Sequence, residues 1–206
     1  MKLTLISLLF AVIFSACNTK NSDHSDKDSK TDTSKTGAPE IDTSAKIKKI
    51  KEISPSFNSI SPAIASSLKM IVDDYLAVKN ALSDNNVDDA RKNGKAMNTD
   101  ISKVDRSLLT PEQKKLFEQE EADLLENSEH IGKTTELEHQ RMHFSVLSEG
   151  MYVIVKAFGG GKVLFHMYCP KAENGEGALW LSESADDNNP YISKGSSCTE
   201  IVEKIK

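Results

Sequence analysis

The chain lacks the sequence motifs of the common enzyme classes. No serine lies in a Gly-x-Ser-x-Gly elbow, and no glycine pattern of the Walker A or dinucleotide-binding type is present. The pair His139 and His143 also lacks the glutamate of a His-Glu-x-x-His motif, because residue 140 is glutamine. These absences predict that the protein is not an enzyme, and no small-molecule substrate is indicated.

Excess positive charge is missing as well. The 206 residues include 26 lysines and arginines against 31 aspartates and glutamates, which gives a formal net charge of −5. The two signs are interspersed, so there is no basic stripe of the kind that nucleic acid requires. Nucleic acid is therefore not an expected partner.

No apolar run reaches the roughly 20 residues of a membrane-spanning helix. The amino terminus instead shows a lipoprotein signal peptide, with Lys2, an apolar stretch over residues 3–14, and Ser15-Ala16 before Cys17. We expect residues 1–16 to be removed and Cys17 to carry lipid. An ordinary secretory signal with an incidental cysteine is the alternative.

Residues 17–60 have few apolar side chains and many Ser, Thr, Asp and Lys residues. Such a composition cannot offset the entropy of ordering, so we expect a disordered tether after the lipidated Cys17. Its last part, "AKIKKIKEI" at residues 45–53, either lies on a membrane surface or forms an extended lead-in. Residues 61–206 are then one domain.

Four segments show helical periodicity. Ser61-Pro62 begins the first, Thr110 to Gln113 form a capping box that begins the third, and Gly159 to Gly161 end the fourth. The second is predicted over residues 87–108. The apolar stripes are Leu68, Ile71, Val72, Tyr75, Val78 and Leu82; Val87, Ala90, Gly94, Met97, Ile101, Val104 and Leu108; Leu116, Phe117, Leu124, Leu125 and Ile131; and Phe144, Leu147, Met151, Ile154 and Phe158.

The carboxyl-terminal part changes character after Lys162. "KVLFHMYC" at residues 162–169 and "GALWLS" at 177–182 read as strands, whereas "TEIVEKIK" at 199–206 reads as a short helix or frayed tail. The predicted fold is mostly α: an antiparallel four-helix up-and-down bundle with a small C-terminal β-hairpin-like cap.

Histidines supply one candidate metal site. His139 and His143 are four residues apart on the fourth predicted helix, so both side chains lie on one face and could chelate one ion. Either could equally be a boundary residue of the core. His130 is expected to face the C-terminal dipole of the third helix and needs no other role.

A second candidate combines His166, Met167 and Cys169. Imidazole, thioether and thiolate are the donors that Cu(I) prefers, although alternation in a strand points His166 away from the other two. The competing interpretation is a structural disulfide between Cys169 and Cys198, since an exported protein meets an oxidising compartment. The chemistry of these residues leaves both open.

Several ordered motifs resemble an uncharacterised bacterial domain family. They are "HQRMHFSVLS" at residues 139–148, "YCPKAENGEGALWLS" at 168–182, "NPY" at 189–191 and the late Cys198. Members of this family occur as stand-alone lipoproteins and as an extra domain on periplasmic adaptor subunits of heavy-metal efflux systems. The resemblance extends from about Met70 to the C-terminus.

The resemblance implies that His143, His166, Cys169 and Cys198 bind copper or another heavy metal. Three positions depart from the family pattern: Lys171 replaces the methionine after Cys-Pro, Tyr168 replaces a frequent histidine, and Thr199 replaces the final glycine. A lysine in place of a thioether opposes cation binding. Met167 is the available substitute for the lost sulfur.

The leading hypothesis is a lipid-anchored periplasmic domain that binds a soft metal, Cu(I), for sequestration or transfer to an efflux system. By analogy with lipoprotein sorting, Asn18 after the lipidated cysteine favours the outer membrane, facing the periplasm. The alternative is a non-catalytic protein-interaction or scaffold domain stabilised by a Cys169–Cys198 disulfide. A redox protein that cycles this bridge has less support, because neither cysteine belongs to a Cys-x-x-Cys pair.

Overall fold

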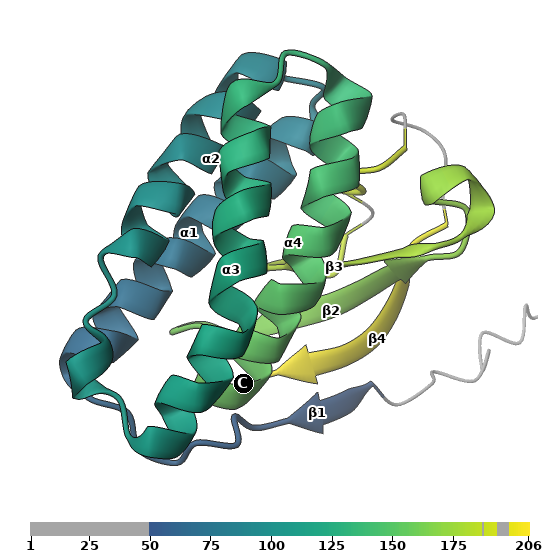
Figure 1. Cartoon of the computed structure of the whole chain (residues 1–206). Helices are drawn as coiled ribbons and strands as arrows, with labels where there is room; N and C mark the ends of the chain where they lie inside the picture. The colour runs from purple at the N-terminus through teal and green to yellow at the C-terminus, as the bar shows by residue number, and fades with distance from the viewer. Residues whose placement is uncertain (1–49, 187, 193–197) are drawn as a thin grey trace, which may run out of the picture. The chain divides into compact units, whose positions relative to one another are not determined.

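The computed structural model describes residues 50–186, 188–192 and 198–206, which form four helices and a small mixed sheet (Figure 1). The expected signal peptide, Cys17 and most of the expected tether lie outside the described residues. The helices are α1 (Pro62–Ser83), α2 (Val87–Ser102), α3 (Pro111–Lys133) and α4 (Leu137–Phe158), with short 3-10 turns η1 (Arg106–Leu108) and η2 (Glu173–Gly175). The strands are β1 (Lys51–Ile53), β2 (Leu164–Cys169), β3 (Ala178–Ser182) and β4 (Glu200–Ile205).

The predicted helix boundaries at α1, α3 and α4 are confirmed. The Ser61 side chain accepts a hydrogen bond from the backbone N–H of Ile64, and Thr110 forms a complete capping box with Gln113. Gly159 follows α4 with φ of 84°, a left-handed backbone that glycine adopts without a Cβ clash. Local capping chemistry therefore sets these ends.

Helix α2 is shorter than predicted. It ends at Ser102, and the chain turns through Lys103 into η1 rather than continuing to Leu108, which is 45% exposed. The side chain of Asp105 accepts from the backbone N–H of Ser107 and so begins the separate turn. The periodic apolar pattern extends past the end of the helix because Val104, although outside α2, is buried in the core.

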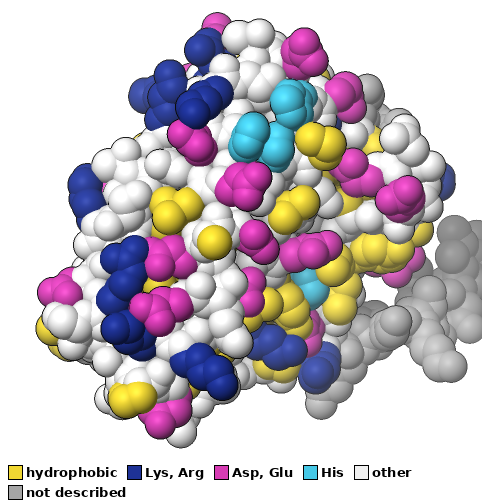
Figure 2. Space-filling view, viewed as in Figure 1, with side chains coloured by type: hydrophobic (Ala, Val, Ile, Leu, Met, Phe, Trp, Pro, Cys, Tyr) yellow, Lys and Arg dark blue, Asp and Glu magenta, His cyan; other side chains and the backbone are white. Residues whose placement is uncertain are grey.

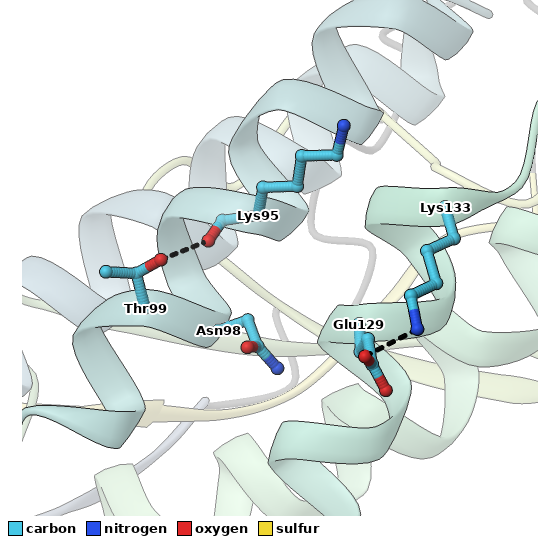
Figure 3. Close-up of a pocket in the computed structure, with 5 residues that line it drawn as sticks. All are labelled: Lys95, Asn98, Thr99, Glu129 and Lys133. Atoms are coloured by element: carbon cyan, nitrogen blue, oxygen red, sulfur yellow. Dashed lines mark hydrogen bonds and ion pairs between the residues drawn. The ribbon is translucent and has the colours of Figure 1, made fainter.

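Consecutive helices pack on one another, and the apolar stripes meet in one core (Figure 1). The contact between α2 and α3 is close: a Cβ atom on Gly94 would lie 3.0 Å from the backbone nitrogen of Gly132. A shallow polar pocket of about 250 Å³ lies beside this crossing (Figure 3). Within it Glu129 pairs with Lys133 at 2.5 Å, so these two charges neutralise each other.

The sheet has the strand order β1-β4-β2-β3. The predicted hairpin is confirmed, since β2 and β3 pair antiparallel with Met167 opposite Trp180. The predicted helix or tail over residues 199–206 is wrong, because β4 lies inside the sheet, antiparallel to β2 and parallel to β1. Val202, Lys204 and Lys206 alternate with Glu203 and Ile205, and both of the latter are buried.

Residues 50–60, which the sequence placed in the tether, contact the folded domain. Strand β1 pairs with β4, and the backbone N–H groups of Ser56 and Phe57 donate to carbonyls of Lys156 and Ala157 at the end of α4. The Phe57 ring lies 4.9 Å from that of Phe158. Apolar Ile53 and Phe57, although few, are enough to hold this segment because the edge of β4 offers backbone partners.

A buried tyrosine connects the helices to the sheet. The Tyr75 hydroxyl accepts from the backbone N–H of Leu181 in β3 at 3.0 Å and shares a 2.7 Å hydrogen bond with Ser148 of α4. Trp180 is a core residue with 1% exposure, and its ring lies 5.8 Å from that of Tyr191. Among the residues that the structure describes, no helix is long and apolar enough to cross a membrane.

Candidate metal site

Three histidines from two helices gather on one face of the protein. His130 lies in the last turn of α3, while His139 and His143 lie in the first half of α4. One ring nitrogen from each forms a group in which all three atoms lie within 4.8 Å of one another. Figure 2 shows a group of cyan histidine side chains at the surface, in the upper part of the view. Within the described part of the chain, this is the single His, Cys, Asp or Glu group of three with such spacing.

The rings are already in contact. Nε2 of His143 lies 3.0 Å from Nε2 of His139. The His143 ring also stacks on that of His130, with centroids 4.3 Å apart and an angle of 12° between the planes. His130 is exposed and the other two are half-buried. An ion can therefore reach the site from solvent on the side of His130.

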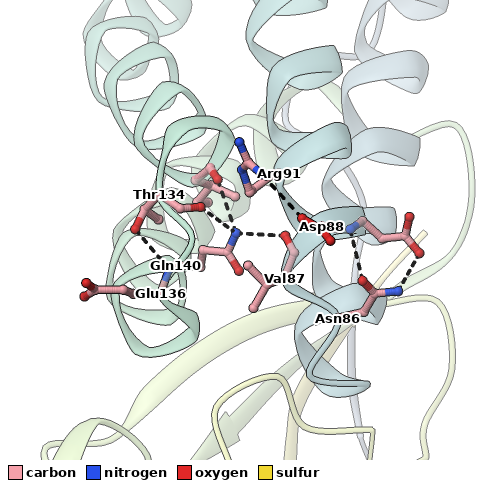
Figure 4. A network of polar contacts seen from close by, with 9 residues as sticks. Asn86, Val87, Asp88, Arg91, Thr134, Glu136 and Gln140 are labelled. Carbon is pink, nitrogen blue, oxygen red and sulfur yellow. Dashed lines mark hydrogen bonds and ion pairs between the residues drawn. The ribbon is translucent and has the colours of Figure 1, made fainter.

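The short connection between α3 and α4 is held by Gln140, which is fully buried. Its side-chain N–H groups face the carbonyls of Val87, Ile131 and Thr134, at 3.1, 3.3 and 3.4 Å (Figure 4). These contacts join the start of α2, the end of α3 and the start of α4. Because Gln140 adjoins His139 in sequence, these hydrogen bonds also fix the position of His139 along α4 relative to His130 on α3.

A buried polar residue of α3, Asn127, contacts the histidine cluster. Oδ1 of Asn127, one turn before His130 on α3, lies 2.9 Å from Nδ1 of His143. Asn127 is 7% exposed and belongs to the buried side of α3. Burial, and then the nearby rings of His130 and His139, lower the pKa of His143 to about 4. At neutral pH the His143 ring is uncharged, which is the form that binds metals.

The residues of the second sequence candidate lie in the sheet. Cys169 forms a disulfide with Cys198, and Met167 is fully buried opposite Trp180. A bulge in β4 leaves Val202 unpaired between the pairs His166–Glu203 and Met167–Ile201. Strand β2 keeps its regular pairing with β3, so His166 and Met167 point to opposite faces of the sheet, and both are buried. The structure thus brings His139 and His143 together with His130, and does not bring His166, Met167 or the cysteines to them.

His166 has surroundings of its own. Its ring is 4% exposed and stacks on Tyr152 of α4, with centroids 3.8 Å apart. Neither ring nitrogen has a hydrogen-bond partner among the described residues, although Nδ1 lies 3.9 Å from Oε1 of Glu203. Burial outweighs the attraction of Glu203 and, with a smaller contribution from Lys156, lowers the pKa of His166 to about 4.

The sequence predicted that His130 faces the C-terminal dipole of the third helix and did not assign it to a metal site. Residue 135 is the middle of the connection between the two helices, and Asn127 and His143 are each eight positions from it. Along two consecutive helices that pack on each other, such positions lie at a similar distance from the connection, and His130 and His139 lie about one turn closer to it. Counting from the loop would therefore have shown that His130 lies at a height similar to that of His139, although the count does not show which sides of the two helices face each other.

The fold and the site define a helical domain with a three-imidazole cluster, closed at its C-terminal end by a disulfide-bonded sheet. Residues 71–162, most of α1 to the loop after α4, match the family model described as protein of unknown function (DUF3347). The matched segment contains all three clustered histidines and ends before β2. No curated protein and no solved structure matches the chain significantly.

Proposed function

We propose that the protein binds one transition-metal ion through His130, His139 and His143. The observation that carries this function is the approach of three imidazole nitrogens, from two helices, to within 4.8 Å of one another. Two Zn–N bonds of about 2.0–2.1 Å at a tetrahedral angle hold their nitrogens roughly 3.3 Å apart. The 3.0 Å separation of His139 and His143 is close to that value.

The donor set favours a divalent ion. Imidazole suits zinc, copper, nickel and iron, whereas thiolate and thioether ligands select Cu(I). The thiols of Cys169 and Cys198 are joined to each other, and Met167 is buried in the sheet. We therefore place Cu²⁺ and Zn²⁺ ahead of the Cu(I) that the sequence suggested, and assign binding to the histidine cluster.

Three protein ligands leave one position of a tetrahedral ion open. Structural zinc sites are closed by four protein ligands, while sites that exchange a ligand keep a position free. Exposure of His130 gives solvent access to that position. This supports reversible binding, as sequestration or transfer of an ion requires, and no catalytic step is proposed.

We place this function in the cell envelope. The signal-peptide pattern before Cys17 supports lipidation and export, and Asn18 supports the outer membrane with the domain facing the periplasm. The resemblance to domains on heavy-metal efflux adaptors supports such a system as the recipient of the ion. In this proposal the four helices form an antiparallel up-and-down bundle that presents the cluster at the α3–α4 end.

Competition titrations with a chromophoric chelator test the function on the exported protein. We expect one Zn²⁺ or Cu²⁺ per chain, and a loss of at least about 100-fold in affinity for His143→Ala or His139→Ala, since even outer-shell changes cost 10–100-fold. His24→Ala, which removes a histidine outside the cluster, is the matched control. Unchanged affinity in both cluster variants would overturn the proposal.

We infer a second function from the Cys169–Cys198 disulfide, a non-catalytic protein-interaction domain. The bridge stabilises the sheet whether or not a metal binds, and Met142 and Val146 on α4 are 47% and 44% exposed. The two functions differ in the titration. If the wild-type protein takes up neither Zn²⁺ nor Cu²⁺ at micromolar ion concentrations, the interaction domain becomes the better explanation.

A further inference from the structure

Asn127 is placed to control which nitrogen of His143 carries a proton. The two side chains meet between α3 and α4, with Oδ1 of Asn127 2.9 Å from Nδ1 of His143. Asn127 is almost fully buried, so water does not compete freely for its amide. This hydrogen bond uses Nδ1 of His143, which faces away from His139. It therefore leaves Nε2 of His143 available to a metal ion.

The orientation of the Asn127 amide follows from its second partner. Its Nδ2 lies 2.8 Å from the backbone carbonyl oxygen of Asp123, one turn earlier on α3. A carbonyl oxygen only accepts hydrogen bonds, so the donating end of the amide must face Asp123. The accepting end, Oδ1, is then the end that faces His143. A reversed amide would set two acceptors against each other at Asp123.

The tautomer of His143 follows from this orientation. Oδ1 of Asn127 cannot donate, so Nδ1 of His143 must carry the hydrogen. A neutral imidazole has one N–H, which leaves a lone pair on Nε2. That lone pair faces Nε2 of His139 at 3.0 Å, within the cluster. With this tautomer His143 accepts a hydrogen bond from Nε2–H of His139, whereas with the opposite tautomer His143 would itself donate and would have no lone pair on this side.

We infer that Asn127 is a positioning residue that fixes His143 as the Nδ1–H tautomer, so that its Nε2 lone pair is ready for a metal ion. The metal part rests on the proposed function; the tautomer can be measured without any metal. In metal sites, the partner behind a ligating histidine sets ring orientation and ligand basicity. An amide at this position orients the ring and adds less basicity than a carboxylate would.

The choice of asparagine also tunes affinity. A carboxylate at residue 127 would accept the same Nδ1–H bond and would add a negative charge behind the ring, so Asn127→Asp should bind Zn²⁺ or Cu²⁺ more tightly, by about 10-fold. Asn127→Leu keeps the approximate volume and removes the acceptor. It should bind the same ions about 10–100-fold more weakly, while His130, His139 and His143 are all still present.

The experiment combines nuclear magnetic resonance with metal titration. Long-range ¹H–¹⁵N spectra of the metal-free, full mature protein at neutral pH report the tautomer of each histidine. We expect His143 as Nδ1–H in the wild type and in Asn127→Asp, and a shift toward Nε2–H in Asn127→Leu. Asn98→Leu is the matched control: Asn98 also bonds a helix carbonyl, that of Leu125 at 2.7 Å, without contacting a histidine.

The outcomes separate the inference from the function on which it rests. Nε2–H at His143 in the wild type, or an unaltered tautomer in a folded Asn127→Leu, overturns the inference even if Zn²⁺ binds. The expected tautomers without any uptake of Zn²⁺ or Cu²⁺ support the positioning role and overturn the proposed function. Weaker binding by Asn127→Leu with unchanged binding by Asn98→Leu supports both.

Discussion

Cys169, the last residue of β2, is joined by a disulfide to Cys198, which lies two residues before β4. The bond links the end of β2 to the segment that leads into β4, and these two strands pair directly with each other in the sheet. It closes a loop with a sequence separation of 29 residues. Cys169 is fully buried within the core that the sheet shares with the helices.

Removal of this bridge should destabilise the domain without affecting metal uptake. For a loop of this length the chain-entropy model gives a loss of about 3–4 kcal/mol in the free energy of unfolding. Urea unfolding of the wild type with and without reductant measures the loss, and the Cys169→Ala, Cys198→Ala double variant should not respond to reductant. An intact bridge should also appear by mass spectrometry of the untreated protein; free thiols in most molecules would contradict it.

Most of the helical structure could be predicted from the sequence because its signals are local. Ser61, Thr110 and Gly159 act on backbone groups within a few residues, and the apolar stripes repeat within each helix. The end of α2 was missed, because Val104 continues the apolar spacing after the helix has ended. Burial in the core does not require helical backbone.

The parts that the sequence did not predict depend on pairing between distant segments. Strand β4 and strand β1 are short and lie at opposite ends of the domain in sequence, so their parallel pairing leaves no local signal. The candidate site shows the same limit. The spacing of His139 and His143 identified one helix face, whereas His130 joins them only through the α3–α4 hairpin.

The buried, neutral His166 should make the stability of the domain depend on pH. Its pKa is about 4 in the folded protein, against a reference value of 6.5, so the unfolded chain binds more protons between these values. Its contribution is therefore present above pH 6.5 and is lost as the pH falls toward 4. Between pH 7 and pH 5 the loss is about 2 kcal/mol for this residue alone.

The variant His166→Phe isolates this effect, because it can keep the stacking on Tyr152 and cannot titrate. Its loss of unfolding free energy between pH 7 and pH 5, measured by urea denaturation, should be smaller than that of the wild type by about 2 kcal/mol. His143, whose pKa is also about 4, contributes to the pH dependence of the unfolding free energy in both proteins, so its effect cancels in the comparison. Parallel pH profiles for wild type and variant would show that His166 is not buried as a neutral ring.

The crossing of α2 and α3 should not tolerate a side chain at Gly94. A Cβ there would lie 2.9 Å from Cγ2 of Ile131 and 3.0 Å from the backbone nitrogen of Gly132. Overpacking costs about 1–3 kcal/mol, and contact with backbone, which cannot rotate away, places Gly94 toward the upper part of this range, above the helix-propensity gain of about 1 kcal/mol for Gly→Ala. Urea unfolding should show Gly94→Ala to be less stable than the wild type.

Gly150 on α4 provides the matched comparison for Gly94. A Cβ at Gly150 would meet only side-chain atoms, the nearest being Cδ2 of Leu124 at 3.1 Å. That side chain can rotate, so the propensity gain has less strain to offset. Gly150→Ala should therefore be clearly more stable than Gly94→Ala. The reverse order would mean that α2 and α3 separate more easily than their close contact indicates.

The Tyr75 hydroxyl should contribute more to the free energy of unfolding than the Tyr191 hydroxyl, although both residues are buried. Tyr75→Phe leaves the backbone N–H of Leu181 without its acceptor at 3.0 Å, and an unsatisfied buried donor costs about 1–3 kcal/mol. Tyr191→Phe removes a donor to the carbonyl of Leu179, whose oxygen has a second lone pair and tolerates the loss better. Urea unfolding should therefore give a lower free energy of unfolding for Tyr75→Phe than for Tyr191→Phe. Equal losses in the two variants would show that the link between α1 and β3 does not depend on the hydrogen bond from Leu181 to Tyr75.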